Sequence, residues 1–341
     1  MITRILILLT AFTSLMVGLI TGVSRTGYWN LLTYLSPYHF LLMTGSFFGT
    51  LITLERAVTL HKKLLHSIPF INGLSLIFFL FKYIDEGIIF LMLGGCIMIM
   101  MYLYFYFQHK NFENVLFIIS ALAYFIGFCY YYIERNLVPT IRWIEIFFLL
   151  TIVAERLELS RFLNVSKFKK QMLLLFILFS LLSSFTINHL TNILFGISIL
   201  CISIWLILYD VAKINIRKNE PHKFRGWALM LGYYWLFIHG LTFILDFINY
   251  DLQIHSFFLG FIMNMIFAHI TIILPAIFKI TYQINHKIYY FIWIIFQLIL
   301  LIRFAIYTLN PINFGIIALI NTIAVILFFI LNAYYLLCRK L

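Results

Sequence analysis

The sequence predicts an all-α polytopic membrane protein with about twelve transmembrane helices, in which residues 1–341 form a single integral membrane domain. The chain is 64% hydrophobic and only 11% charged, whereas a soluble domain is about 45–50% apolar and about 25% charged. Its apolar residues form long runs, each able to cross a hydrocarbon core of about 30 Å. The runs lack the alternating pattern of membrane barrel strands, so they are expected to be helices.

Twelve apolar runs follow one another along the chain. The first, residues 5–22, follows Arg4 as in a signal peptide, but no small-residue cleavage site comes after it. It is therefore expected to be retained as the first helix. The other helices are expected at residues 38–57, 67–83, 87–107, 114–133, 138–158, 171–187, 192–212, 225–248, 254–278, 288–308 and 313–337. These runs leave no room for a soluble domain.

The basic residues indicate how the chain crosses the membrane. The net charge is +12, and most of the 24 Lys and Arg residues lie in short loops between apolar runs. This distribution predicts a lipid bilayer as the partner rather than nucleic acid. If the N-terminus and every second loop share one side, 19 basic residues lie there, and the other side keeps five: Arg25, Lys82, Arg135, Arg142 and Arg303. We therefore expect a multi-pass protein of the cell membrane with both termini in the cytoplasm.

Weak internal similarity suggests three quasi-repeated four-helix units. Glu55-Arg56 and Glu155-Arg156 end two predicted helices whose positions differ by four helices. These charges are interpreted as structural, in reciprocal pairs Glu55–Arg156 and Glu155–Arg56, or as a proton relay. Membrane proteins are often built from such repeats, and their binding sites lie between them.

Four histidines lie within the apolar runs: His39, His239, His255 and His269. An ionisable residue at membrane depth is a candidate functional residue, and neutral imidazole is a common ligand of haem iron and copper. His39 and His255 are expected at matching heights near the outer ends of their helices, with His239 in the same layer. His269 comes 14 residues after His255. It is therefore expected about 21 Å deeper in the membrane than His255, at 1.5 Å per residue. The alternative is that each ring only hydrogen-bonds a neighbouring helix.

The sequence around these histidines resembles the NnrS family of haem- and copper-containing membrane proteins linked to nitric oxide. The similar strings are H-G-L-T from His239, H-S-F-F-L-G-F from His255 and M-I-F-A-H-I around His269. The twelve-helix layout is more distantly similar to haem–copper oxidase subunit I. The resemblance implies that His39 and His255 are the axial ligands of a haem b. His239 and His269 would be further ligands of iron or of copper.

The departures from the oxidase pattern bear on the chemistry. Gln253 stands where an oxidase carries a second histidine, and the runs 138–158 and 171–187 contain no histidine to bind copper. Oxygen reduction is therefore not expected. The resemblance favours electron transfer, or sensing or handling of nitric oxide, with a quinone or another redox partner. Whether the protein turns over a substrate stays open.

Two other functional classes remain. The protein could be a proton-coupled secondary transporter, in which intramembrane Glu55, Glu145, Glu155 and His269 relay protons. It could also be a non-catalytic scaffold subunit whose polar residues only pack helices together.

Overall fold

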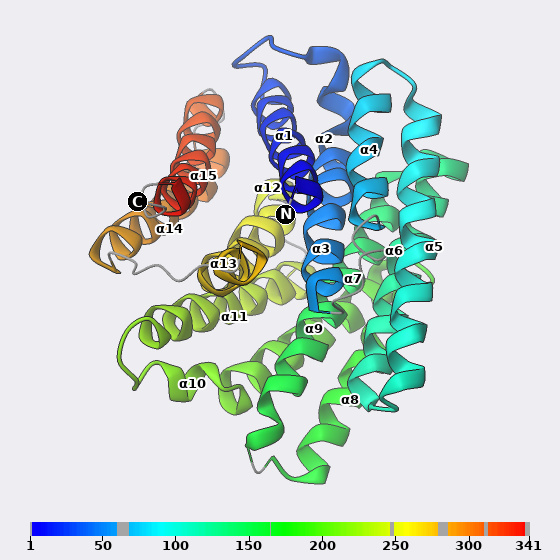
Figure 1. Cartoon of the computed structure of the whole chain (residues 1–341), viewed down its shortest axis with the longest axis vertical. Helices are drawn as coiled ribbons and strands as arrows, with labels where there is room; N and C mark the ends of the chain where they lie inside the picture. The colour runs from blue at the N-terminus through cyan, green and yellow to red at the C-terminus, as the bar shows by residue number, and fades with distance from the viewer. Residues whose placement is uncertain are drawn as a thin grey trace. The chain divides into compact units, whose positions relative to one another are not determined.

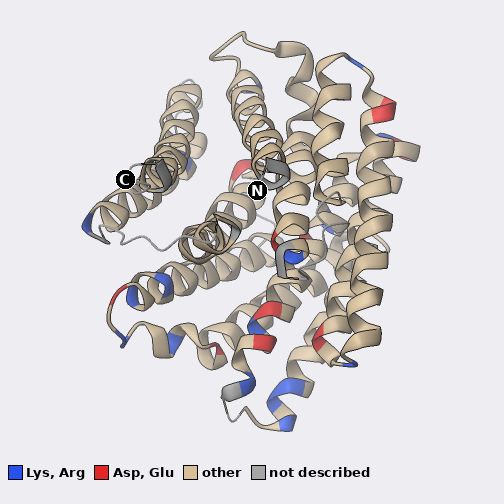
Figure 2. Cartoon of the chain, viewed as in Figure 1, with Lys and Arg blue, Asp and Glu red and all other residues tan. Residues whose placement is uncertain are grey.

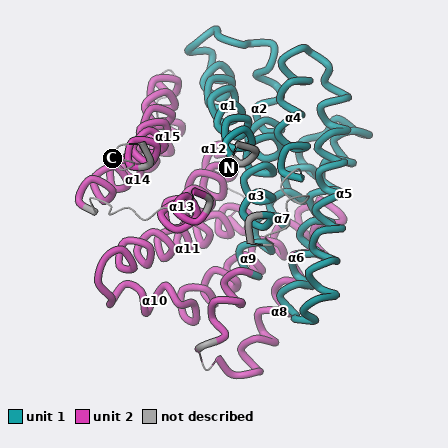
Figure 3. Tube along the Cα trace, in the orientation of Figure 1, with its two compact units in different colours: residues 1–154 teal, residues 155–341 magenta. Residues whose placement is uncertain are grey.

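The computed structural model describes residues 2–59, 68–163, 165–245, 249–278, 286–309 and 313–337, and within these ranges it is all helical, without strands (Figure 1). The chain divides into two compact units, Met1–Ala154 and Glu155–Leu341 (Figure 3). The single integral membrane domain stays a prediction. Each unit is described below by itself.

The first unit consists of antiparallel helices joined by short connections. α4, α5 and α6 pack side by side in chain order, and α1 packs against the helix that begins at His39. The elements are α1 (Ile2–Ser24), η1 (Thr33–Tyr38), α2 (His39–Leu41), η2 (Leu42–Gly49), α3 (Thr50–Thr59), α4 (Ile68–Leu80), α5 (Ile84–Gln108), α6 (Phe112–Glu134) and most of α7 (Leu137–Leu159).

The second unit begins within the last turns of α7. Its α8 packs on α9, α9 on α11, α11 on α13 and α14 on α15. The elements are η4 (Ser160–Phe162), α8 (Lys167–Leu182), α9 (His189–Tyr209), α10 (Ala212–Asn215), α11 (His222–Ile244), α12 (Tyr250–His255), η5 (Ser256–Ile262), α13 (Met263–Phe278), α14 (His286–Leu309) and α15 (Phe314–Leu337).

Within the described ranges, nine helices are long and apolar enough to cross a membrane. They are α1, α5, α6, α7, α9, α11, the helix formed by α12, η5 and α13, α14 and α15. The other three predicted runs are also helical, but α4 has 13 residues, α8 has 16 and the run from His39 is divided by η2. Figure 2 shows the long central part of α5 without charged residues, as a helix that crosses a membrane requires.

The count of twelve transmembrane helices and the cytoplasmic termini stay predictions. Five of the basic residues on which the predicted orientation rests, Lys62, Lys63, Lys279, Arg339 and Lys340, lie outside the described residues.

Two π-helical segments occur in the helices that carry His39 and His255. η2 begins three residues after His39 and η5 begins one residue after His255. Each contains the tripeptide Ser-Phe-Phe, at residues 46–48 and 256–258. π-Helical turns are rare and occur frequently at functional sites. The two helices therefore share an unusual backbone feature as well as a histidine near its start.

The contact between α9 and α11 depends on two glycines. A Cβ added to Gly196 would lie 2.7 Å from the backbone oxygen of Gly240, and one added to Gly240 would lie 2.9 Å from the oxygen of Gly196. Both obstacles are backbone atoms, which cannot rotate away as a side chain can. The two helices can therefore approach this closely only without side chains at these positions.

We expect Gly240→Ala to lower the free energy of unfolding in detergent by about 1–3 kcal/mol, because the added methyl overpacks a backbone contact. A denaturant titration followed by circular dichroism measures the change. Ile197→Ala is the matched control, because Ile197 neighbours Gly196 but is 45% exposed. Equal free energies of unfolding for Gly240→Ala and the wild type would contradict this prediction, because α9 and α11 could then move apart to admit the methyl group without loss of stability.

Candidate functional site

His255 is positioned by the first turns of α12. The Asn249 side chain caps this helix by accepting a hydrogen bond from the Leu252 backbone N–H at 2.8 Å. Asp251 follows in the first turn, and a spacing of four residues places His255 on the same helix face. Nδ1 of His255 lies 2.7 Å from Oδ1 of Asp251. The helix itself therefore brings the carboxylate to the imidazole.

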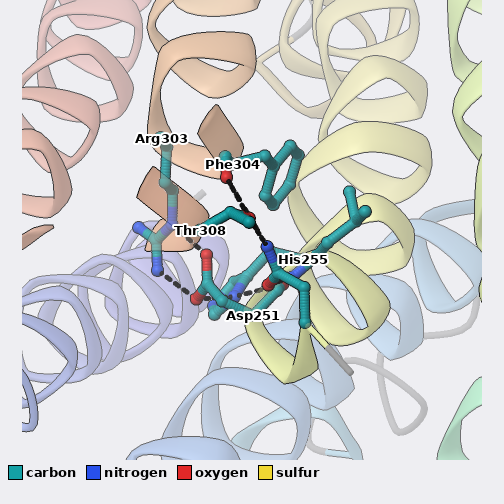
Figure 4. A network of polar contacts seen from close by, with 7 residues as sticks. Asp251, His255, Arg303, Phe304 and Thr308 are labelled. Atoms are coloured by element: carbon teal, nitrogen blue, oxygen red, sulfur yellow. Dashed lines mark hydrogen bonds and ion pairs between the residues drawn. The ribbon is translucent and has the colours of Figure 1, made fainter. Parts of the chain in front are cut away.

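Arg303 of α14 holds the same carboxylate from a second helix (Figure 4). Its Nε lies 2.8 Å from Oδ2 of Asp251 and its Nη2 lies 2.8 Å from Oδ1. Two parallel charge-assisted hydrogen bonds are the strongest way to fix a carboxylate. The Asp251 and Arg303 side chains are only 7% and 9% exposed. Asp251 therefore keeps its negative charge in a largely buried place, because Arg303 neutralises it.

A second hydrogen bond joins α12 to α14 beside this ion pair. Nδ2 of Asn249 donates to Oγ1 of Thr308 at 2.8 Å, and Thr308 in turn donates to the Phe304 carbonyl (Figure 4). We call Asp251, His255 and Arg303 the Asp251 network. Together with the hydrogen bond from Asn249 to Thr308, it fixes the N-terminal end of α12 through both charged and neutral contacts.

The protonation pattern of His255 follows from these contacts. A carboxylate only accepts hydrogen bonds, so Nδ1 carries the proton and Nε2 carries the lone pair when the ring is neutral. Among the described residues, Nε2 has no hydrogen-bond partner, and the side chain is 23% exposed. This arrangement, with Nδ1–H bound to a carboxylate and Nε2 available, is typical of a metal-ligating histidine.

His239 of α11 lies beside the segment that carries His255. Its Nδ1 lies 2.8 Å from the carbonyl oxygen of Gln253, and its buried ring packs at 5.0 Å from the ring of Phe257. The carbonyl only accepts, so Nδ1 is again the protonated nitrogen. Within the second unit, the structure thus brings His239 to the same stretch of chain as His255.

His39 is held by α1. Its Nδ1 donates to the Gly18 carbonyl at 2.7 Å, and the ring packs closely against Gly22, where an added Cβ would lie 2.7 Å from Cε1. Gly22 therefore makes the space for the ring, and Gly18 sets its tautomer. His39 belongs to the first unit and His255 to the second. Their meeting at one level of the membrane stays a prediction.

His269 has a different environment. Its Nδ1 donates to the Met265 carbonyl at 2.8 Å, and Nε2 lies 2.5 Å from Nη2 of Arg156. Because arginine only donates, the lone pair of Nε2 is engaged by the guanidinium. Tyr233 donates a hydrogen bond to Oδ1 of Asp210 at 3.0 Å, and its hydroxyl is also hydrogen-bonded to the Arg156 side chain. The structure therefore places His269 in a buried polar cluster around Arg156.

Of the other charges predicted to be structural or proton-relaying, the two Glu-Arg pairs lie near the ends of α3 and α7, and Glu145 lies inside α7. Arg56 stacks on the ring of Phe117 at 4.0 Å from its centroid, and Glu55 and Glu155 are half-buried. Glu145 is almost fully buried, with 2% of its surface exposed. The reciprocal pairs Glu55–Arg156 and Glu155–Arg56 stay predictions.

His39, His239 and His255 share one feature, an Nδ1 nitrogen that donates a hydrogen bond. In the described part of the chain, no group of three or more His, Cys, Asp or Glu side chains is arranged to hold a metal ion. A haem iron needs only one or two protein ligands, because the porphyrin supplies four. Metal-ligating histidines almost always have such an anchored ring nitrogen, so each of these three rings is a candidate metal ligand.

Sequence reasoning missed Asp251 and Arg303. Asp251 stands four residues before His255, so their common helix face could have been read from the sequence. Arg303 lies inside the apolar run 288–308, where an arginine needs a partner. Its pairing with Asp251 joins segments 52 residues apart, and no local pattern reveals it.

The fold and these contacts define a helical membrane-type protein with buried ionisable side chains and anchored histidines. The chain belongs to a family described as a domain of unknown function (DUF8744), whose model matches residues 4–336. No curated protein and no solved structure matches the chain.

Proposed function

We propose that this protein binds haem b in the membrane, with His39 and His255 as the axial ligands, and serves electron transfer or the sensing or handling of nitric oxide. The observation that carries the proposal is the geometry of His255, whose Nδ1 is bound to a buried carboxylate that Arg303 holds. Such a partner fixes the ring orientation and increases the basicity of Nε2. The resemblance to the NnrS family adds to this chemistry.

The residues around the proposed haem have distinct roles. His255 and His39 bind and orient the cofactor, Gly18 and Asp251 hold their rings, and Phe257 and His239 help to exclude water. When bound, haem b supplies a one-electron redox centre. His239 and His269 are the further ligands available if copper is also bound. The contact of His269 with Arg156 would have to open first.

The membrane arrangement is part of the same proposal. Twelve helices in three quasi-repeated four-helix units would lie in the cell membrane, with both termini in the cytoplasm. The paired π-helical segments after His39 and His255 support an equivalence of two of these helices. A quinone or another membrane redox partner would exchange electrons with the site. Nucleic acid is not a partner in this proposal.

The test is the visible spectrum of protein purified in detergent from cells supplied with haem precursors. We expect reduced-minus-oxidised bands of haem b at about one haem per chain. The spectral change on adding carbon monoxide or nitric oxide to the reduced protein shows whether either gas displaces one of the axial ligands. Purified, stably folded protein without haem bands would contradict the proposal and would favour a scaffold role.

Proton-coupled transport is a second candidate, favoured by the buried contact between Arg156 and His269. Ionisable groups at membrane depth commonly mark proton or ion pathways. In this function Glu55, Glu145, Glu155 and His269 would carry the proton. Proton-coupled uptake by liposomes containing the protein, abolished in Glu55→Gln, would support it. Tight liposomes with no proton movement under a pH gradient would contradict it.

A further inference from the structure

The Asp251 network distinguishes His255 from the other two histidines with an anchored Nδ1. His39 and His239 donate to neutral backbone carbonyls, those of Gly18 and Gln253. Nδ1 of His255 donates instead to an ionised side chain, the carboxylate of Asp251. A hydrogen bond to an ionised acceptor is about twice as strong as one between neutral groups. The electronic character of a bound iron would therefore be set mainly from the His255 side.

We propose that Asp251 is a positioning residue that lowers the reduction potential of the haem bound at His255, and that Arg303 limits this effect. The inference rests on the proposed function. Negative charge next to an axial ligand favours the ferric state, which carries one positive charge more than the ferrous state. Reduction adds one electron to the iron and breaks no bond, so the charge of Asp251 acts directly on this equilibrium.

The burial of the pair makes the effect large. Asp251 is 7% exposed, so water screens its charge only weakly. Its Oδ1 lies 2.7 Å from Nδ1 of His255, whereas Arg303 contacts the carboxylate and has no hydrogen bond to the imidazole among the described residues. The negative charge is thus nearer to the ligand than the positive one. Arg303 therefore allows the carboxylate to stay charged while buried, and the net electrostatic potential of the pair at His255 is still negative.

The test is a spectroelectrochemical titration of the purified haem protein with dithionite as reductant. Asp251→Asn keeps the size of the side chain and an oxygen that can accept from Nδ1, but it removes the charge. We expect the equilibrium constant of reduction to rise tenfold or more, which for one electron is an upward shift of about 59 mV or more. The haem content measured beside it shows whether His255 still binds.

Thr308→Val is the matched control, because it removes the neighbouring hydrogen bond between α12 and α14 without changing any charge. If Asp251 acts through its charge, the reduction potential of Thr308→Val equals that of the wild type within the measurement error of a few millivolts. An equal upward shift in Thr308→Val would overturn the inference, because it would assign the effect to the anchoring of α12.

The double variant Asp251→Asn, Arg303→Gln answers the case in which Asp251→Asn fails to fold with Arg303 unpaired. It removes both charges together. The protein tolerates this change much better than the loss of one partner, because no unpaired charge is left buried. We expect a smaller upward shift than in the single variant. A bound haem whose potential is unchanged in both variants overturns the role of Asp251 and leaves the proposed function intact. A wild-type protein without haem contradicts both.

Discussion

His255→Ala is expected to reduce the haem content of the purified protein to less than about a tenth of the wild-type value. Loss of a partner beside a metal ligand already costs about 10–100-fold in affinity, and loss of the ligand itself costs at least as much. The variant also leaves Asp251 without its imidazole donor. The measurement is the haem-to-protein ratio after size-exclusion chromatography, from the pyridine haemochrome spectrum.

His189→Ala is the control for this loss, because His189 begins α9 at an exposed position away from the apolar runs. It should keep the full haem content. His39→Ala should behave like His255→Ala if the two rings bind the same iron. A His255→Ala protein that keeps the wild-type ratio would show that the Asp251 network serves only to fix α12.

The second large effect concerns stability. Arg303→Met should lower the free energy of unfolding by about 3–5 kcal/mol, because it leaves the buried carboxylate of Asp251 without its cation. Methionine retains much of the apolar volume that packs near Phe314, whose ring centroid lies 5.0 Å from the Arg303 guanidinium carbon. Chemical unfolding in detergent, followed by tryptophan fluorescence, measures the loss.

An exposed ion pair of the same type gives the comparison. Arg135 pairs with Asp85 at positions where the side chains are 43% and 59% exposed. Arg135→Met should therefore change stability by no more than about 1 kcal/mol. Equal effects of Arg303→Met and Arg135→Met would mean that water reaches Asp251 and would remove the electrostatic basis of the network.

Much of the fold is predictable from the sequence because helices in lipid must satisfy their own backbone hydrogen bonds. The long apolar runs, such as residues 87–107 and 114–133, indeed correspond to α5 and α6. The π-helical segments η2 and η5 could not be predicted, because they shift backbone pairing without changing composition. The division into units at Ala154 likewise follows from packing rather than from any linker in the sequence.

The candidate site was predictable only in part. The four histidines are visible because each interrupts an apolar run, and the structure describes all four. The different role of His269 depends on Arg156, a residue 113 positions away in the chain. The carboxylate of Asp251 was overlooked because it lies at the helix end, where a charge needs no special explanation. Its significance appears only with Arg303 beside it.

The central claim, that His39 and His255 together bind one haem iron, is tested most directly by the low-temperature electron paramagnetic resonance spectrum of the oxidised protein. We predict a low-spin ferric signal from two imidazole ligands in the wild type. His39→Ala and His255→Ala should each replace it by a high-spin signal or leave no haem signal. A low-spin signal that persists unchanged in either variant would contradict the claim.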